Sequence, residues 1–109
     1  MALQALGSAT RPTAFFAANN FIAFGAYRAV RDAGLRVPDD IAMVAFDDLP
    51  AALVIEPFFT VAAQPAYEMG RRATRLLLSR LAGEEPIPCQ EVVLPFELIV
   101  RRSSGLPRG

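Results

Sequence analysis

Three short apolar segments of this chain each end at a polar side chain that can form several hydrogen bonds. The segments and the polar residues that follow them are 13–18 with Asn19, 41–46 with Asp47, and 60–63 with Gln64. A short, continuously apolar run is typical of a strand in a parallel sheet that is covered on both faces. We therefore expect three neighbouring strands, each with a polar group at its carboxyl end.

Helical patterns separate these strands. Asn at position 19 or 20 is a favoured N-cap, and the periodic apolar segment that follows it ends at Gly34. A second helix should cover 66–82, because Pro65 suits a first helical turn and Gly83 follows the last residue. The remaining features are the tail of a helix at 2–6, about one helical turn within 49–55, extended segments at 91–94 and 97–102, and a loose tail from 103. This alternation predicts an α/β fold, an open parallel sheet with flanking helices.

Composition limits the chemistry that this chain can perform. Its 109 residues suffice for one domain, and its 11 basic and 11 acidic side chains balance, so no net charge attracts nucleic acid. There is no His, no Lys and a single Cys, Cys89, which excludes Ser-His-Asp and Cys-His catalysis and a thiolate metal site. Glycine motifs for dinucleotides or phosphates are absent. We expect no enzyme activity, metal or cofactor, and no membrane span, since every apolar stretch is too short to cross a bilayer.

The polar residues at the strand ends form the candidate ligand site. Open α/β sheets bind ligands outside the carboxyl ends of their strands. Asp47 can accept two hydrogen bonds at once, and Asn19 and Gln64 can both donate and accept, which suits a ligand with several hydroxyls or ring nitrogens. Asn19 and Asn20 also suit a helix cap alone. Asp47 and Asp48 could instead cap the following turn or, less plausibly, bind a divalent cation.

The first long helix carries more apolar surface than one sheet can cover. Ile22 belongs to the stripe that we expect to face the sheet, whereas Phe21, Phe24 and Tyr27 point to another face. The full predicted sheet-facing stripe is Ile22, Ala26, Ala29, Val30 and Ala33. A second aromatic face requires a second partner, which is either another part of the chain or another subunit.

The second long helix has a core stripe on one side and a charged face on the other. The predicted stripe consists of Met69, Ala73, Leu76, Leu77 and Leu81. The opposite face carries Glu68 and Arg72 at the spacing of an i, i+4 ion pair, which indicates a solvated surface.

Several motifs occur together and in order. They are Pro12-Thr13-Ala14, Ala17-Ala18-Asn19-Asn20, the segment from Ala33 to Ile41, Val44-Ala45-Phe46-Asp47-Asp48, Pro57, Thr60-Val61 and Gln64-Pro65. The chain from about Pro12 to Ser103 thereby closely resembles the lactose/galactose repressor family of bacterial transcription regulators. The resemblance implies the C-terminal part of a ligand-sensing domain, a two-lobed fold like that of the periplasmic sugar-binding proteins (type I).

The resemblance also implies roles for single positions. Asn19, Asp47 and Gln64 match effector-contacting positions, with Asp47 at the residue that grips sugar hydroxyls. Phe24, Val54 and Ile55 match positions of the dimer interface. We add Phe21 to this interface, because it belongs to the surplus aromatic face of the first long helix. The implied division is a second-lobe core at 12–64, a helix and strand of the other lobe at 65–97, a return strand at 98–102 and a tail at 103–109.

This chain departs from the family pattern in two places and lacks several parts of it. Asn20 stands where the family usually has Asp, and Ala45 where it usually has Gly. A DNA-binding headpiece, its hinge and most of the first lobe are missing, so we expect either an expressed fragment or a truncated reading frame.

The sequence thus predicts a partial effector-binding domain of a cytoplasmic repressor. We expect it to bind a small polar metabolite such as a sugar, to form a homodimer or larger assembly, and to reach operator DNA only through the missing headpiece. A fragment of a periplasmic-type sugar-binding protein is the first alternative. An α/β enzyme, which the absence of His and Lys disfavours, and a module that serves dimerisation alone are the others.

Overall fold

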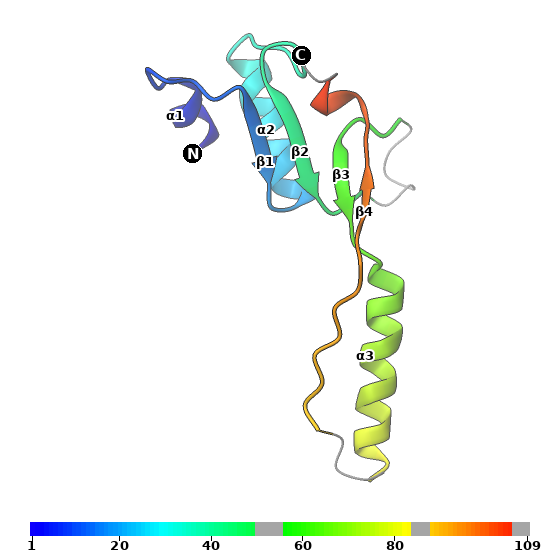
Figure 1. Cartoon of the computed structure of the whole chain (residues 1–109). Coiled ribbons are helices and arrows are strands. Elements are labelled where there is room, and N and C mark those ends of the chain that lie inside the picture. Colours follow the sequence, from blue (N-terminus) through cyan, green and yellow to red (C-terminus); the bar gives the residue numbers. More distant parts are fainter. Residues whose placement is uncertain (50–55, 84–87, 106–109) are drawn as a thin grey trace. The chain divides into compact units, whose positions relative to one another are not determined.

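The computed structural model describes residues 1–49, 56–83 and 88–105 (Figure 1). The chain divides into two compact units, Met1–Ala63 with Leu98–Gly109, and Gln64–Glu97. Within the described ranges, no helix combines the length and the apolar character that crossing a bilayer requires.

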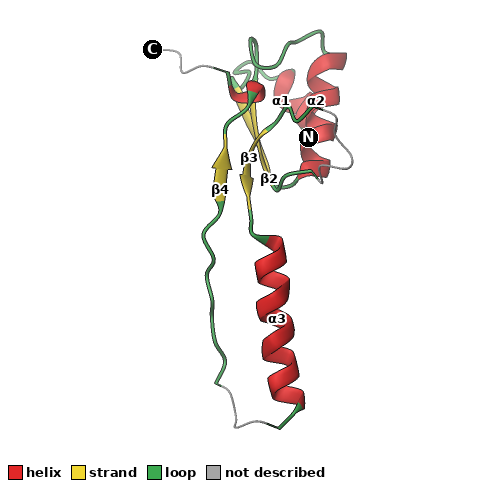
Figure 2. Ribbon diagram, turned by 90° about the vertical axis from the view of Figure 1, so that its right-hand side faces the viewer, coloured by secondary structure: helices red, strands yellow, loops and turns green. Residues whose placement is uncertain are grey.

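The first unit contains most of the sheet. Its elements are α1 (Ala2–Leu6), β1 (Ala14–Ala17), α2 (Asn20–Asp32), β2 (Ala42–Phe46), β3 (Thr60–Ala63) and the short 3₁₀ helix η2 (Arg102–Ser104), and β4 (Glu97–Ile99) leads into it from the second unit. The strand order is β1-β2-β3-β4, and β1, β2 and β3 are parallel. The arrow of β4 in Figures 1 and 2 runs opposite to that of β3. The predicted α/β class with an open sheet is confirmed.

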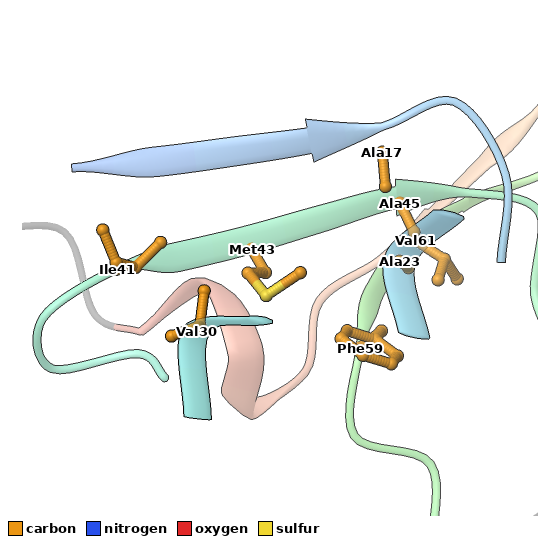
Figure 3. Packing of buried hydrophobic residues seen from close by; sticks show 8 residues of the cluster. All are labelled: Ala17, Ala23, Val30, Ile41, Met43, Ala45, Phe59 and Val61. Atoms are coloured by element: carbon orange, nitrogen blue, oxygen red, sulfur yellow. The ribbon is translucent and has the colours of Figure 1, made fainter. Parts of the chain in front are cut away.

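The core of the first unit lies between α2 and one face of the sheet. Figure 3 shows its members, which come from β1, α2, β2, β3 and the segments that precede β2 and β3. Val30, Ile41 and Met43 are fully buried, and Figure 2 shows α1 and α2 together on this side of the sheet. Burial of a side chain of this size stabilises the fold by about 1.5 to 3 kcal/mol, so this layer contributes most of the unit's apolar stabilisation.

The other face of the sheet is more open than the sequence predicted. Phe16 in β1 is 68% exposed, while Ala17, the next residue, is buried. Successive side chains of a strand point to opposite faces, so Phe16 lies on the face away from α2. The expectation that β1 is covered on both faces is therefore wrong for the described residues, because α2, the helix that contacts β1, lies on one side of the sheet.

The sheet-facing stripe of α2 differs from the predicted one. Ile22 is 51% exposed, whereas Ala23 and Val30 are completely buried and Ala26 and Tyr27 pack partly against the core. These four positions recur at helical spacing from Ala23. The N-cap at Asn19 and the contact with β2 determine which side of α2 faces the sheet, because the apolar pattern alone allows more than one choice. The assignment of Ile22 to the core was wrong.

The second unit consists of α3 (Ala66–Leu81) and an extended return segment (Figure 2). Met69, Ala73 and Leu76 line a shallow hollow with Val92 and Leu94 of that segment. No residue of α3 is buried, and Leu77 and Leu81 are exposed. The return segment therefore covers only part of the predicted core stripe.

Backbone pairing in the second unit also differs from the prediction. The described residues 88–96 include no strand, although 91–94 was expected to be one. A strand requires a neighbouring strand for its backbone hydrogen bonds, and the described part of this unit offers none there.

The charged face of α3 agrees with the sequence. Glu68 accepts a hydrogen bond of 2.7 Å from Nε of Arg72, as predicted, and two more from Arg71. These guanidinium groups lower the pKa of Glu68 to about 2. The pair lies on an exposed surface, so it adds little to stability.

The C-terminal segment is not the loose tail that the sequence predicted from position 103. Ser103 is fully buried, its hydroxyl donates to the Met43 carbonyl at 2.6 Å, and it accepts from the Thr60 amide at 2.8 Å. These partners lie in β2 and β3, far away in the chain, so no local pattern could identify them. Ser103 therefore joins η2 to the centre of the sheet.

Candidate functional site

The polar residues identified in the sequence follow the carboxyl ends of the parallel strands. In the register of the sheet, Ala17 of β1 lies opposite Ala45 of β2, and Phe46 lies opposite Ala62 of β3. The three strands therefore end at the same edge. Asn19 follows β1 and Asp47 follows β2 at this edge, which is where open α/β sheets bind ligands.

Asn19 is the N-cap of α2, as one of the two sequence interpretations predicted. Its backbone is extended, and its Oδ1 accepts a hydrogen bond of 2.8 Å from the amide of Ile22. The cap uses the side-chain oxygen, whereas the amide group of an Asn also carries two N–H donors. Capping and ligand contact are therefore compatible at this residue.

Asp47 has an unusual backbone conformation. Its φ is 69°, the only positive value at a non-glycine residue in the described chain. Asp and Asn tolerate this left-handed region better than most residues, at a cost of order 1 kcal/mol. The amide of Asp47 donates to the carbonyl of Ala62 at 3.0 Å, which ties the residue to β3. This hydrogen bond restrains one side of the turn after β2.

Gln64 directly follows β3 and is the first residue of the second unit. Asn19 and Asp47 belong to the first unit. The structure therefore brings two of the three predicted ligand residues to neighbouring strand ends in one unit, and Gln64 follows the third strand end.

The main functional candidate that sequence reasoning missed is an ion pair beside Asp47. Arg101 donates from Nη1 and Nη2 to Oδ1 and Oδ2 of Asp48, at 2.7 and 2.6 Å. These hydrogen bonds lower the pKa of Asp48 and raise that of Arg101. The two residues are 53 positions apart, and no spacing rule connects them.

The ion pair also bears on the possible cation site. The Asp48 carboxylate already binds a guanidinium, and the described residues contain no group of three or more metal-ligating side chains. Among these residues, the interpretation of Asp47 and Asp48 as a cation site has no structural support.

A cavity of about 260 Å³ lies beside this turn in the first unit. Its apolar lining includes four aromatic residues in mutual contact, and its polar lining includes Asn20, Asp48 and Arg101. Of the three predicted ligand residues, only Asp47 borders it. The four aromatic residues are Phe24, Tyr27, Phe58 and Phe59.

The predicted subunit interface is described only in part. Phe21 is 82% exposed, while Phe24 makes an edge-to-face contact with Phe59 at a centroid distance of 5.6 Å. The chain therefore covers part of the aromatic face itself. Val54 and Ile55, which were also predicted to belong to the interface, lie outside the described residues.

Comparison with known proteins gives one family match and many relatives. A model of the periplasmic binding protein-like domain matches residues 1–104. A lactose operon repressor from Rhizobium radiobacter is 42% identical over 97 residues, which is 89% of this chain and 84% of the relative. A probable opine utilization operon repressor from Rhizobium rhizogenes is 39% identical over 94% of this chain and 52% of its own length.

Solved structures agree with these sequence relatives. A LacI family transcriptional regulator from Enterococcus faecium with bound ribose has a TM-score of 0.77 and 34% identity, over 94% of this chain. This chain covers 37% of that structure, and about half of the opine operon repressor.

Proposed function

Because this chain belongs to the periplasmic binding protein-like family, and within it to the lactose-repressor (LacI) family of transcription regulators, we propose that it is the ligand-sensing C-terminal part of a repressor. The proposed ligand is a small polar metabolite such as a sugar. Relatives named for lactose and solved with ribose support this class of ligand. The role is non-enzymatic, because sensing requires binding and a change of shape but no reacting group.

The observation that carries the proposal is the arrangement at the strand ends. Asp47, with its left-handed backbone, carries a carboxylate directly after β2, and Asn19 carries an amide at the N-cap of α2, shortly after β1. A carboxylate accepts hydrogen bonds from two hydroxyls of a sugar, and an amide N–H donates to another oxygen. In this proposal Gln64, which directly follows β3, supplies a third polar contact.

Replacement of Asp47 by Asn tests the ligand site. We expect the dissociation constant for the sugar to rise about ten- to a hundredfold, because charge-assisted hydrogen bonds contribute about 1.5 to 3 kcal/mol. The complete gene product that carries this chain would be titrated calorimetrically with a sugar panel that includes lactose and ribose.

The matched control is Asp32→Asn, which removes a carboxylate from the exposed end of α2. This variant should bind as the parent does. An unchanged dissociation constant for Asp47→Asn would exclude Asp47 from the site, and a protein that binds none of the sugars would contradict the proposed ligand class.

The relation to DNA is indirect in this proposal. The chain has no net charge that would attract phosphates, so in this proposal operator binding belongs to a separate headpiece. A repressor that acts on DNA works in the cytoplasm. The alternative, a fragment of a periplasmic-type sugar-binding protein, shares the fold but has less support, because the relatives described above are repressors or transcriptional regulators.

We also propose that the chain associates through the aromatic end of α2, as a homodimer or a larger assembly. Phe21, Phe24, Val54 and Ile55 form the proposed interface. Phe21 is the sharpest probe, because it is almost fully exposed, whereas Phe24 also contacts Phe59 within the chain.

The variant Phe21→Arg tests this contact by light scattering at micromolar concentration. We expect the parent chain to have at least twice the monomer mass and the variant to shift towards the monomer, because a charged side chain cannot be buried unpaired in an apolar interface. Phe16→Arg is the control, since Phe16 is exposed in β1 rather than in α2. A monomeric parent chain, or equal masses for both variants, would contradict the proposal.

A further inference from the structure

The conformation of Asp47 requires support from its surroundings. A non-glycine residue at a φ of 69° persists only where neighbouring contacts over-determine it. The amide of Asp47 bonds to β3, but this contact fixes the residue on one side only. The next residue, Asp48, is held by several further contacts, which restrain the same turn.

Asp48 is held from three directions. Its Oδ1 accepts from the amide of Leu49 at 2.8 Å, its carbonyl accepts a long bond of 3.4 Å from Nδ2 of Asn20, and its carboxylate binds Arg101 through two parallel hydrogen bonds. The pair with Arg101 is the strongest of these, because it is charged, has two bonds, and is mostly shielded, with side-chain exposures of 18% and 31%.

Arg101 is itself anchored to the sheet. Its amide donates to Oγ1 of Thr60 at 2.8 Å, and its Nη1 donates to the carbonyl of Phe59 at 3.1 Å. The guanidinium therefore has a defined position relative to β3. Because it is planar and forms two parallel hydrogen bonds, it also fixes the orientation of the Asp48 carboxylate, which the single ammonium group of a Lys would not do.

We propose that Arg101 is a positioning residue for the ligand site: through its paired hydrogen bonds with Asp48 it holds Asp47 in the left-handed conformation that aims the Asp47 carboxylate at the ligand. The role in binding rests on the proposed function, whereas the effect on the backbone of Asp47 does not depend on it. Arg101 itself need not touch the ligand.

The first test measures the backbone of Asp47 without ligand. In Arg101→Gln, we expect the φ-dependent amide coupling of Asp47 in NMR spectra to change and its amide to exchange about tenfold faster or more, while the amide of Val44 in β2 keeps its protection. Arg101→Lys keeps the charge but lacks the fork, so it should restore only part of the protection at Asp47.

The control is Arg102→Gln. Arg102 is the adjacent residue and also forms an ion pair, with Glu56, but that pair is exposed and does not include Asp47 or Asp48. This variant should leave the coupling and the exchange rate of Asp47 unchanged.

The second test is a calorimetric titration of the complete gene product with lactose and ribose. Arg101→Gln should weaken binding about tenfold, and in the background of Asp47→Asn it should add little, because both changes remove the same contact.

Two results would overturn the positioning role. One is that the amide coupling and the amide exchange rate of Asp47 stay unchanged in Arg101→Gln. The other is an equal loss of protection at Asp47 and Val44 in both Arg101 variants, which indicates a general structural role. Unchanged sugar binding in Asp47→Asn would instead contradict the proposed function, while the backbone result would still decide whether Arg101 holds the turn.

Discussion

Replacement of Ser103 by alanine is expected to lower the free energy of unfolding by about 2 to 4 kcal/mol. The hydroxyl of Ser103 is fully buried and has two partners, the amide of Thr60 and the carbonyl of Met43. Alanine leaves both backbone groups without this partner, away from water. A buried polar group that loses its hydrogen bond costs about 1 to 3 kcal/mol, which is a large part of the stability of a small domain.

Chemical denaturation of this chain, followed by far-UV circular dichroism, gives the measurement. Ser8→Ala is the matched control, because the Ser8 hydroxyl bonds only to the exposed carbonyls of Ala5 and Thr10. It should change the free energy of unfolding by less than about 0.5 kcal/mol. Equal effects of the two substitutions would mean that Ser103 does not join the C-terminal segment to the sheet.

Replacement of Met43 by alanine is expected to cost about 2 to 5 kcal/mol. Met43 lies in β2, between β1 and β3, and its side chain is completely buried near Val30 of α2 (Figure 3). Alanine removes the contacts between the sheet and the helix and leaves a cavity that close-packed neighbours fill only in part.

The control for Met43→Ala is Phe16→Ala, in the neighbouring strand. It removes a larger side chain, but one that is mostly exposed on the other face of the sheet, so we expect a loss below about 1 kcal/mol. The comparison separates burial from size. A larger loss of stability for Phe16→Ala than for Met43→Ala would mean that the main apolar layer does not lie on the face of the sheet that α2 covers.

The sequence by itself determined the α/β class, the three parallel strands and an N-cap of α2 at Asn19 or Asn20. These features depend on residues that are close in the chain: an apolar run predicts a strand, and Asn19 caps the helix that begins one residue later. The resemblance to the repressor family rested on the same local segments, and the family assignment is confirmed by the relatives. The roles of Asn19, Asp47 and Gln64 in ligand binding remain predictions.

Tertiary structure decided which face of each element is buried and which distant residues support the candidate site. The apolar pattern of α2 is compatible with a core at Ile22 or at Ala23, and only packing against β2 selects Ala23. Arg101 and Ser103 had no local signal, because the partners described above lie between 41 and 60 residues away in the chain. A charge or a hydroxyl acquires such a role only when folding removes it from water and brings its partner within hydrogen-bonding distance.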